Sequence, residues 1–190
     1  MKIAIVCFDN FTDIDVFLPW DLLNRVRLVG GISDWDVQLL GTKETHISMS
    51  GLRIPMTGSI SDLPSADAVI FASGKGIQDL YKNQQYINSI HIDPQKQLIG
   101  SMCSGSLLLG AKKLLTGKKA TTYPSVVEQL KEFGVDVIEK SFVKEGNIST
   151  AAGCFAAQEL SVWIIRTLIN EEMVEIVLET VQPVGKGLYF

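Results

Sequence analysis

Short apolar runs alternate with segments of helical periodicity along the chain. Four runs are rich in apolar and β-branched residues, as is typical of strands buried on both faces. These runs lie within residues 2–8, 35–41, 66–76 and 96–102. The segments between and after them place apolar residues three or four positions apart, which predicts helices. These helices are expected at residues 14–29, 77–91, 104–115, 125–133 and 155–181.

Turn signals predict the remaining elements. Residues 45–60 alternate between apolar and polar around Ser50-Gly51, which indicates a hairpin. Residues 136–153 read as two strands joined at Glu145-Gly146-Asn147, and residues 118–124 as a short strand. Asn170 precedes two glutamates, so it is a good helix N-cap, and the last helix is expected to break there.

Regular alternation of strands and helices predicts a mainly parallel sheet covered by helices on both faces, in one domain of residues 1–190. Sites in such sheets form beyond the carboxyl ends of the strands. Three loops are therefore expected at one edge: the loop after Phe8, the glycine loop of residues 73–76, and the corner at Cys103.

Composition narrows the classes of function. The chain has 190 residues, of which 46% are hydrophobic and 20% charged, with a net charge of −4, so it can build a core and offers no basic face for nucleic acid. No apolar run approaches the roughly 20 residues of a membrane span, and the first residues do not resemble a signal peptide. The three cysteines are widely spaced, which matches neither a disulfide framework nor a zinc motif. We expect a cytoplasmic protein with no metal and no cofactor.

Cys103 is placed where a reactive cysteine could work. It ends a predicted strand, Ser104 begins a predicted helix, and small residues follow, as in a nucleophile elbow. The free N–H groups and partial positive charge of a helix start favour the thiolate. The alternative is a buried cysteine that packs as a small hydrophobe. Cys7 is expected in the core, and Cys154, at the start of the last helix, is a weaker alternative nucleophile.

Two aspartates flank the start of the first helix. Asp13 is explained as a helix cap. Asp15 has apolar neighbours on both sides, so its carboxylate is expected to face a pocket, where desolvation raises its pKa into a range useful for acid–base chemistry.

Backbone amides and histidines complete the candidate chemistry. The N–H groups of Gly74 and Ser104 are candidates for an oxyanion hole. His46 lies in the predicted hairpin, and His91 lies near the end of a predicted helix, at the opposite edge of the sheet from Cys103. Both are therefore expected to be surface or structural residues. A papain-like mechanism, which needs a Cys–His pair, is therefore poorly supported.

Four segments, taken in order, resemble the ThiJ/PfpI superfamily: IVCFDNFTDIDVFLPWDLL, VIFASGKG, GSMCSGSLLLGAKKLLTGKKATTYP and ISTAAGCFAAQEL. The resemblance covers nearly the whole chain, and the segment around the cysteine is its most specific part. It implies a flavodoxin-like three-layer α/β/α sandwich, related to class I glutamine amidotransferases. The isonitrile hydratase branch is the most similar.

The resemblance also assigns roles by position. The family's nucleophile falls on Cys103, the acid of the first helix on Asp15, the hydroxyl residue after the nucleophile on Ser104, and the glycine loop on Ser73 and Gly74. Two departures follow. The usual PGG reads ASG, which puts one oxyanion amide in question. The usual TG before the helix proline is replaced by Phe17 and Leu18, which implies a bulkier, apolar pocket wall beside the acid.

These assignments imply a cysteine-dependent enzyme that acts on a small uncharged substrate, most specifically hydration of an isonitrile to an N-substituted formamide. Protease or amidase activity and glyoxalase-like attack on an aldehyde are alternatives within the superfamily. A third alternative is a non-enzymatic sensor of cysteine oxidation or a small-ligand binding module. By resemblance the chain is expected to form a homodimer.

Overall fold

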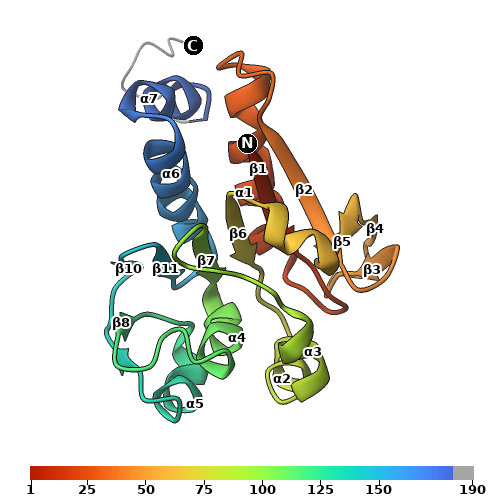
Figure 1. Ribbon diagram of the computed structural model, residues 1–190, viewed down its shortest axis with the longest axis vertical. Helices are drawn as coiled ribbons and strands as arrows, with labels where there is room; N and C mark the ends of the chain where they lie inside the picture. The colour runs from red at the N-terminus through yellow and green to blue at the C-terminus, as the bar shows by residue number, and fades with distance from the viewer. Residues whose placement is uncertain (182–190) are drawn as a thin grey trace.

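In the computed structural model, residues 1–181 are described, and seven strands form one central sheet (Figure 1). Their order is β10-β11-β7-β6-β1-β2-β5. Every pairing is parallel except that of β10 with β11. The strands span β1 (Lys2–Val6), β2 (Asp36–Gly41), β5 (Gly58–Ser59), β6 (Ala68–Phe71), β7 (Leu98–Met102), β10 (Phe142–Glu145) and β11 (Ile148–Ala151). The expected domain also includes residues 182–190, which lie outside the described residues.

Two small sheets stand apart from the central one. The predicted hairpin is confirmed: β3 (Thr45–Ile47) pairs antiparallel with β4 (Arg53–Pro55). The short strand β8 (Lys119–Ala120) pairs in parallel with β9 (Asp136–Val137), a strand that the sequence pattern did not separate from β10.

Helices cover the sheet and complete the three-layer α/β/α sandwich of flavodoxin-like type (Figure 1). The helices α1, α6 and α7 pack against one another, and α4 packs against α2 and α5. Their bounds are α1 (Asp13–Leu28), α2 (Ile77–Leu80), α3 (Gln84–Ser89), α4 (Ser106–Ala111), α5 (Val127–Lys131), α6 (Ala157–Leu168) and α7 (Glu171–Glu179). The 3₁₀ helices are η1 (Ile60–Ser65), η2 (Cys103–Gly105), η3 (Pro124–Val126) and η4 (Cys154–Ala156). None of the described helices is both long and apolar enough to span a membrane.

Several predicted helices are shorter than their patterns suggested. The segment 77–91 divides into α2 and α3 because the Asn83 side chain accepts a hydrogen bond from the Tyr86 N–H and so caps a new helix. The helix after Cys103 begins as a 3₁₀ turn and ends before Lys113, whose φ of 60° is left-handed. At the chain's last helical segment, Asn170 caps α7 as predicted.

The strands are buried because they lie inside the sandwich. All four residues of β6 and all five of β7 are buried. Gly100 of β7 leaves room for Leu160 of α6, whose Cδ1 would lie 2.6 Å from a Cβ added at Gly100. The neighbouring carboxyl ends of β1, β6, β7 and β11 consequently meet at one edge, where the candidate site lies.

Candidate active site

Cys103 is the first residue of η2, directly after β7, and lies on a strained turn. Its φ of 45° is left-handed, which a residue with a side chain rarely adopts, and its side chain is 3% exposed. The hydroxyls of Ser106 and Thr122 each donate to its carbonyl oxygen, at 3.1 Å. Gly105 lets the turn approach β6, since a Cβ there would lie 2.6 Å from the Ala72 carbonyl oxygen. The turn therefore has the geometry of a nucleophile elbow.

Asp15 reaches the same place from the first turn of α1 and is fully buried. The Ser73 hydroxyl donates a short hydrogen bond to its Oδ2 atom. Its Oδ1 atom has no hydrogen-bond partner among the described residues. A buried carboxylate oxygen in this condition costs free energy, which points to a chemical role. Asp13, expected as a cap, is the first residue of α1 and accepts a hydrogen bond from the Ser50 hydroxyl instead.

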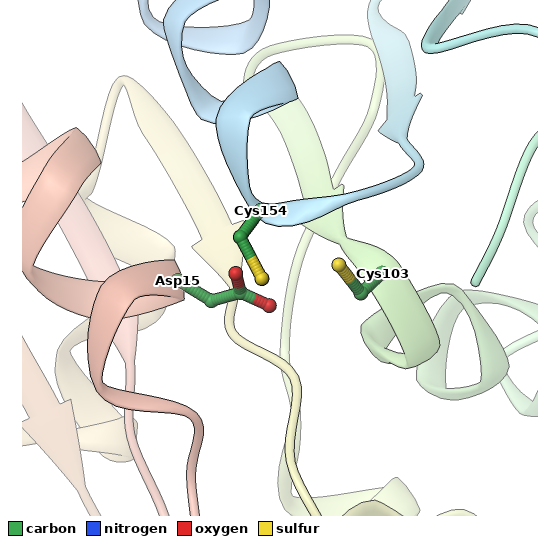
Figure 2. A group of neighbouring side chains, drawn as sticks. All are labelled: Asp15, Cys103 and Cys154. Atoms are coloured by element: carbon green, nitrogen blue, oxygen red, sulfur yellow. The ribbon is translucent and has the colours of Figure 1, made fainter.

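A third side chain joins this pair. Ligand atoms of Asp15, Cys103 and Cys154 all lie within 4.8 Å of one another. Figure 2 shows the three side chains directed toward one another from α1, from the turn after β7, and from η4. Two thiols and a carboxylate are all side chains that can ligate a metal ion, the thiols favouring a soft ion and the carboxylate a hard one.

The electrostatics of this cluster oppose a resting thiolate. Burial raises the pKa of the Cys103 thiol well above its usual range, and Asp15 and Cys154 raise it further, while the N–H of Gly153 lowers it. Burial, with help from Asp15, raises the pKa of Cys154 to about 11. The expectation that the helix start acidifies Cys103 is therefore wrong, because desolvation and a neighbouring negative charge outweigh a helix of only six residues.

A cavity of about 350 Å³ opens onto Cys103. It is lined by Thr12, Met49, Ser73, Gly74, Lys75, Gln78, Cys103, Ser104, Tyr123, Ser125, Val126 and Cys154. Four of the site residues expected from the sequence thus share one cavity, and Asp15 is joined to it through its hydrogen bond to Ser73. Phe17 and Leu18 are not among the described residues that line it. Both pack against the core, and the Phe17 ring lies edge-on to that of Phe11.

The glycine loop is held against the loop after β1. Gly74 has a φ of 145°, and a Cβ there would lie 2.1 Å from the Asn10 carbonyl oxygen, so only glycine fits. The Thr12 N–H donates to the Ser73 carbonyl oxygen at 2.7 Å. This contact joins the loop that carries Gly74 to the start of the helix that carries Asp15.

Both histidines lie outside this cavity. His46 is buried and its Nδ1 atom lies 3.0 Å from Oδ1 of Asp9. His91 lines a different cavity, beside Lys112. The cavity of Cys103 is accordingly lined by two thiols and by no imidazole, and the nearest carboxylate, that of Asp15, is linked to it through Ser73.

Comparison with known proteins agrees with this geometry. Residues 1–167 match the DJ-1/PfpI family. The chain belongs to the DJ-1/PfpI family. It is similar to an isonitrile hydratase from Pseudomonas putida, with 26% identity over 93% of this chain and 76% of that protein. It is similar to the glutathione-independent glyoxalase DJ-1 of Schizosaccharomyces pombe, with 27% identity over 80% of this chain and 83% of that protein.

Solved structures share this fold even where few residues are identical. A ThiJ/PfpI family protein from Pseudomonas syringae has a TM-score of 0.83 at 23% identity, over 95% of this chain and 74% of that one. The predicted ThiJ/PfpI resemblance and the predicted fold are therefore both confirmed.

Within this DJ-1/PfpI fold, the sequence did not reveal that Cys154 joins the site. The sequence pattern predicts it only as a weaker, alternative nucleophile at a helix start. The signal lies in the strand order, because Ala151 of β11 is paired with Met102 of β7, so the residues after these two strands are neighbours. Strand order is set by tertiary packing and is not encoded in the local pattern.

Proposed function

We propose that this protein is a cysteine-dependent enzyme for a small uncharged molecule, and most specifically that it hydrates isonitriles to N-substituted formamides. The supporting observation is the pairing of the Cys103 thiol with the buried Asp15 carboxylate at a cavity that no histidine lines. This reaction needs one nucleophile and one proton carrier. It releases no amine, so it needs no imidazole to protonate a leaving group.

In the first step the Cys103 sulfur forms a bond to the isonitrile carbon. The thiol proton passes through Asp15 to the same carbon, which gives a thioformimidate. A thiol that is protonated at rest suits this step, because the proton it carries is consumed by the addition. The unpartnered Oδ1 atom of Asp15 is free to accept that proton.

In the second step water adds to the thioformimidate carbon. Asp15 takes a proton from the water and passes it to the nitrogen, with Ser104 assisting in holding the water. The carbon–sulfur bond then breaks, the oxygen forms the formamide carbonyl, and its proton returns to the Cys103 sulfur. One water is consumed and the thiol is regenerated. The N–H groups of Gly74 and Ser104 are the proposed donors to the developing oxygen charge.

The similarity to the isonitrile hydratase supports this choice, since it extends over most of both chains. The similarity to the glyoxalase supports a second candidate, in which Cys103 attacks the aldehyde carbon of a small dicarbonyl. Amide or peptide hydrolysis is less well supported, because the cavity offers no imidazole for the leaving amine. A cytoplasmic location and a homodimer stay predictions.

The test is to incubate the purified protein with cyclohexyl isonitrile and to measure N-cyclohexylformamide by mass spectrometry. Turnover is expected in the wild type and in Cys7→Ala, and is expected to be lost in Cys103→Ala. Cys7 is a matched control, since it is a buried cysteine in the loop after β1 and does not line the cavity.

A parallel assay with methylglyoxal separates the two candidates. Conversion of methylglyoxal without any formamide would replace the hydratase by the glyoxalase reaction. Formamide production that persists in Cys103→Ala would overturn the assignment of the nucleophile.

A further inference from the structure

The pair of thiols at this site has a use that the proposed reaction does not require. Hydration needs one sulfur, yet a second one, that of Cys154, lies within 4.8 Å of both Cys103 and Asp15. The Asp15 Oδ1 atom is fully buried, has no hydrogen-bond partner among the described residues, and belongs to the carboxylate that faces both sulfurs (Figure 2). We propose that Cys103 and Cys154 are a redox pair that a hydroperoxide converts to an intramolecular disulfide.

The backbone arrangement suits a disulfide. Cys103 directly follows Met102, and Cys154 follows Ala151 by three residues, and these two strand ends are paired in register. Neighbouring strands lie about 4.8 Å apart, so the turns that carry the two cysteines begin side by side. Since a disulfide bond is about 2.05 Å long, the two sulfurs need to approach by less than about 3 Å.

The two cysteines differ in how firmly they are held. The carbonyl of Cys103 accepts two side-chain hydrogen bonds and its turn packs against β6. Cys154 is only partly buried, follows Gly153 at a φ of 84° and precedes Phe155, whose side chain is 82% exposed. A Cβ at Gly153 would meet no atom within 4 Å. Cys154 is therefore the partner that moves, and Cys103 stays in place.

The oxidation can be written with every atom accounted for. The Cys103 sulfur attacks the distal oxygen of the hydroperoxide and the oxygen–oxygen bond breaks. The thiol proton passes through Asp15 to the departing oxygen, which leaves as an alcohol, or as water when the oxidant is hydrogen peroxide. Cys103 is now a sulfenic acid.

The Cys154 sulfur then attacks the Cys103 sulfur. The sulfur–oxygen bond breaks and hydroxide leaves as water, with the proton that Cys154 gives up. Two thiols and one hydroperoxide thus yield one disulfide, one alcohol and one water. A dithiol reductant reverses the change. While the disulfide exists, Cys103 cannot attack a substrate, whichever reaction it catalyses.

Cys154 also protects the site in this scheme. A sulfenic acid without a second thiol is oxidised further to the sulfinic acid, which simple thiols do not reduce. Both cysteines line the 350 Å³ cavity, which is the route by which a hydroperoxide would approach them. Resolution by Cys154 keeps the oxidation reversible.

The test measures the thiols and not the activity, so its failure is distinguishable from failure of the proposed function. The full chain is treated with a small excess of hydrogen peroxide in the presence of a chelator, alkylated and digested, and its peptides are identified by mass spectrometry. The expected product is a peptide pair that links Cys103 to Cys154 within one chain, and a dithiol reductant should restore both free thiols. Cys7→Ser is expected to behave like the wild type.

The variants sharpen the result. In Cys154→Ser the linked peptide is expected to be lost, and Cys103 should instead gain two oxygen atoms as sulfinic acid. In Cys103→Ser, Cys154 should remain a thiol. Cys154 lies in an open turn, so its serine variant is expected to fold, which circular dichroism checks. Equal sulfinic acid formation at Cys103 in the wild type and in Cys154→Ser, or a linkage between chains only, would overturn the proposal.

Discussion

The Asp15 carboxylate is fully buried, yet only one of its oxygens accepts a hydrogen bond from the described residues. A carboxylate oxygen of Asp15 and the sulfurs of Cys103 and Cys154 lie within 4.8 Å of one another, so the site contains three groups that could each carry negative charge. Burial first, and then the neighbouring Asp15 and Cys154, raise the pKa of Cys103, so the thiol form is favoured. At the scale of the residue, the site is therefore characterised by how protons are distributed among Asp15, Cys103 and Cys154.

Replacing Asp15 by asparagine is expected to lower the formamide turnover by about 10²–10⁴-fold, which is the usual contribution of a general acid–base group. The pKa of Cys103 should fall at the same time, because the negative charge that raises it is gone. Alkylation by iodoacetamide should therefore begin at a lower pH in the variant.

Initial rates of turnover and pH profiles of alkylation measure the two effects. Asp13→Asn is the matched control, since Asp13 begins the same helix and does not line the cavity. An unchanged alkylation profile in Asp15→Asn would contradict the electrostatic account.

The residue types of the site could be predicted from the sequence, but their interactions could not. A cysteine at a strand–helix corner and an acid among apolar neighbours are visible in the pattern. The hydrogen bond from Ser73 to Asp15 joins residues 58 positions apart and depends on how two loops pack. The failed expectation for Cys103 has the same cause, because burial is a property of the folded molecule.

At the scale of the element, α6 supports the strand that carries the nucleophile. Leu160 of α6 is fully buried and fills the space above Gly100 of β7. The strands and most helices were predictable because their apolar periodicity is strong. The ends of the helices were less predictable, because apolar periodicity does not encode them. The Asn83 side chain caps and so starts a new helix, and the left-handed backbone of Lys113 follows the end of another.

Leu160→Ala is expected to reduce the free energy of unfolding by about 2–5 kcal/mol, because it leaves a cavity beside Gly100 that a compact sheet cannot fill. Urea unfolding followed by circular dichroism measures the change. Val162→Ala is the matched control, since Val162 lies on the same helix and is only half-buried. An equal decrease in the free energy of unfolding in the two variants would show that the contact between Leu160 and Gly100 adds no extra stability.

At the scale of the whole molecule, ionic contacts of Asp9 join loops that are far apart in the sequence. Asp9, in the loop after β1, contacts Lys43 at 2.6 Å and the buried His46 at 3.0 Å. Lys43 chiefly, with His46 and the Ile47 N–H, lowers the pKa of Asp9 to about 2, against an opposing contribution from burial. The folded state therefore holds this carboxylate in its charged form more strongly than the unfolded chain does.

This shift predicts a dependence of stability on pH. Between the unfolded pKa of 3.8 and the folded pKa of about 2, the unfolded chain binds more protons, so stability contributed by Asp9 is present above 3.8 and is lost as the pH falls toward 2. Asp9→Asn should be less stable than the wild type at neutral pH, and the difference should shrink below pH 4. Thermal unfolding over this pH range measures it, and a difference that stays constant would contradict the assignment. Asp36→Asn, on the exposed start of β2, is the control.

The fold class could be predicted from the alternation of strands and helices, but the arrangement of the strands could not. The position of β11 beside β7 brings the last part of the sheet to the nucleophile. No local pattern distinguishes that order from another, because the residues of a strand do not show which strand lies beside it. The membership of Cys154 in the site follows from this order alone.

The three side chains of the cluster come from α1, from the turn η2 after β7, and from the turn η4 before α6. During refolding, contacts between such distant segments close the longest loops and form after local structure. Proximity of the two sulfurs should thus be among the last features to appear after dilution from denaturant. If refolding is interrupted by pulses of oxidant, the time at which the cross-link between the two sulfurs first forms would report when the sheet is complete, without any substrate.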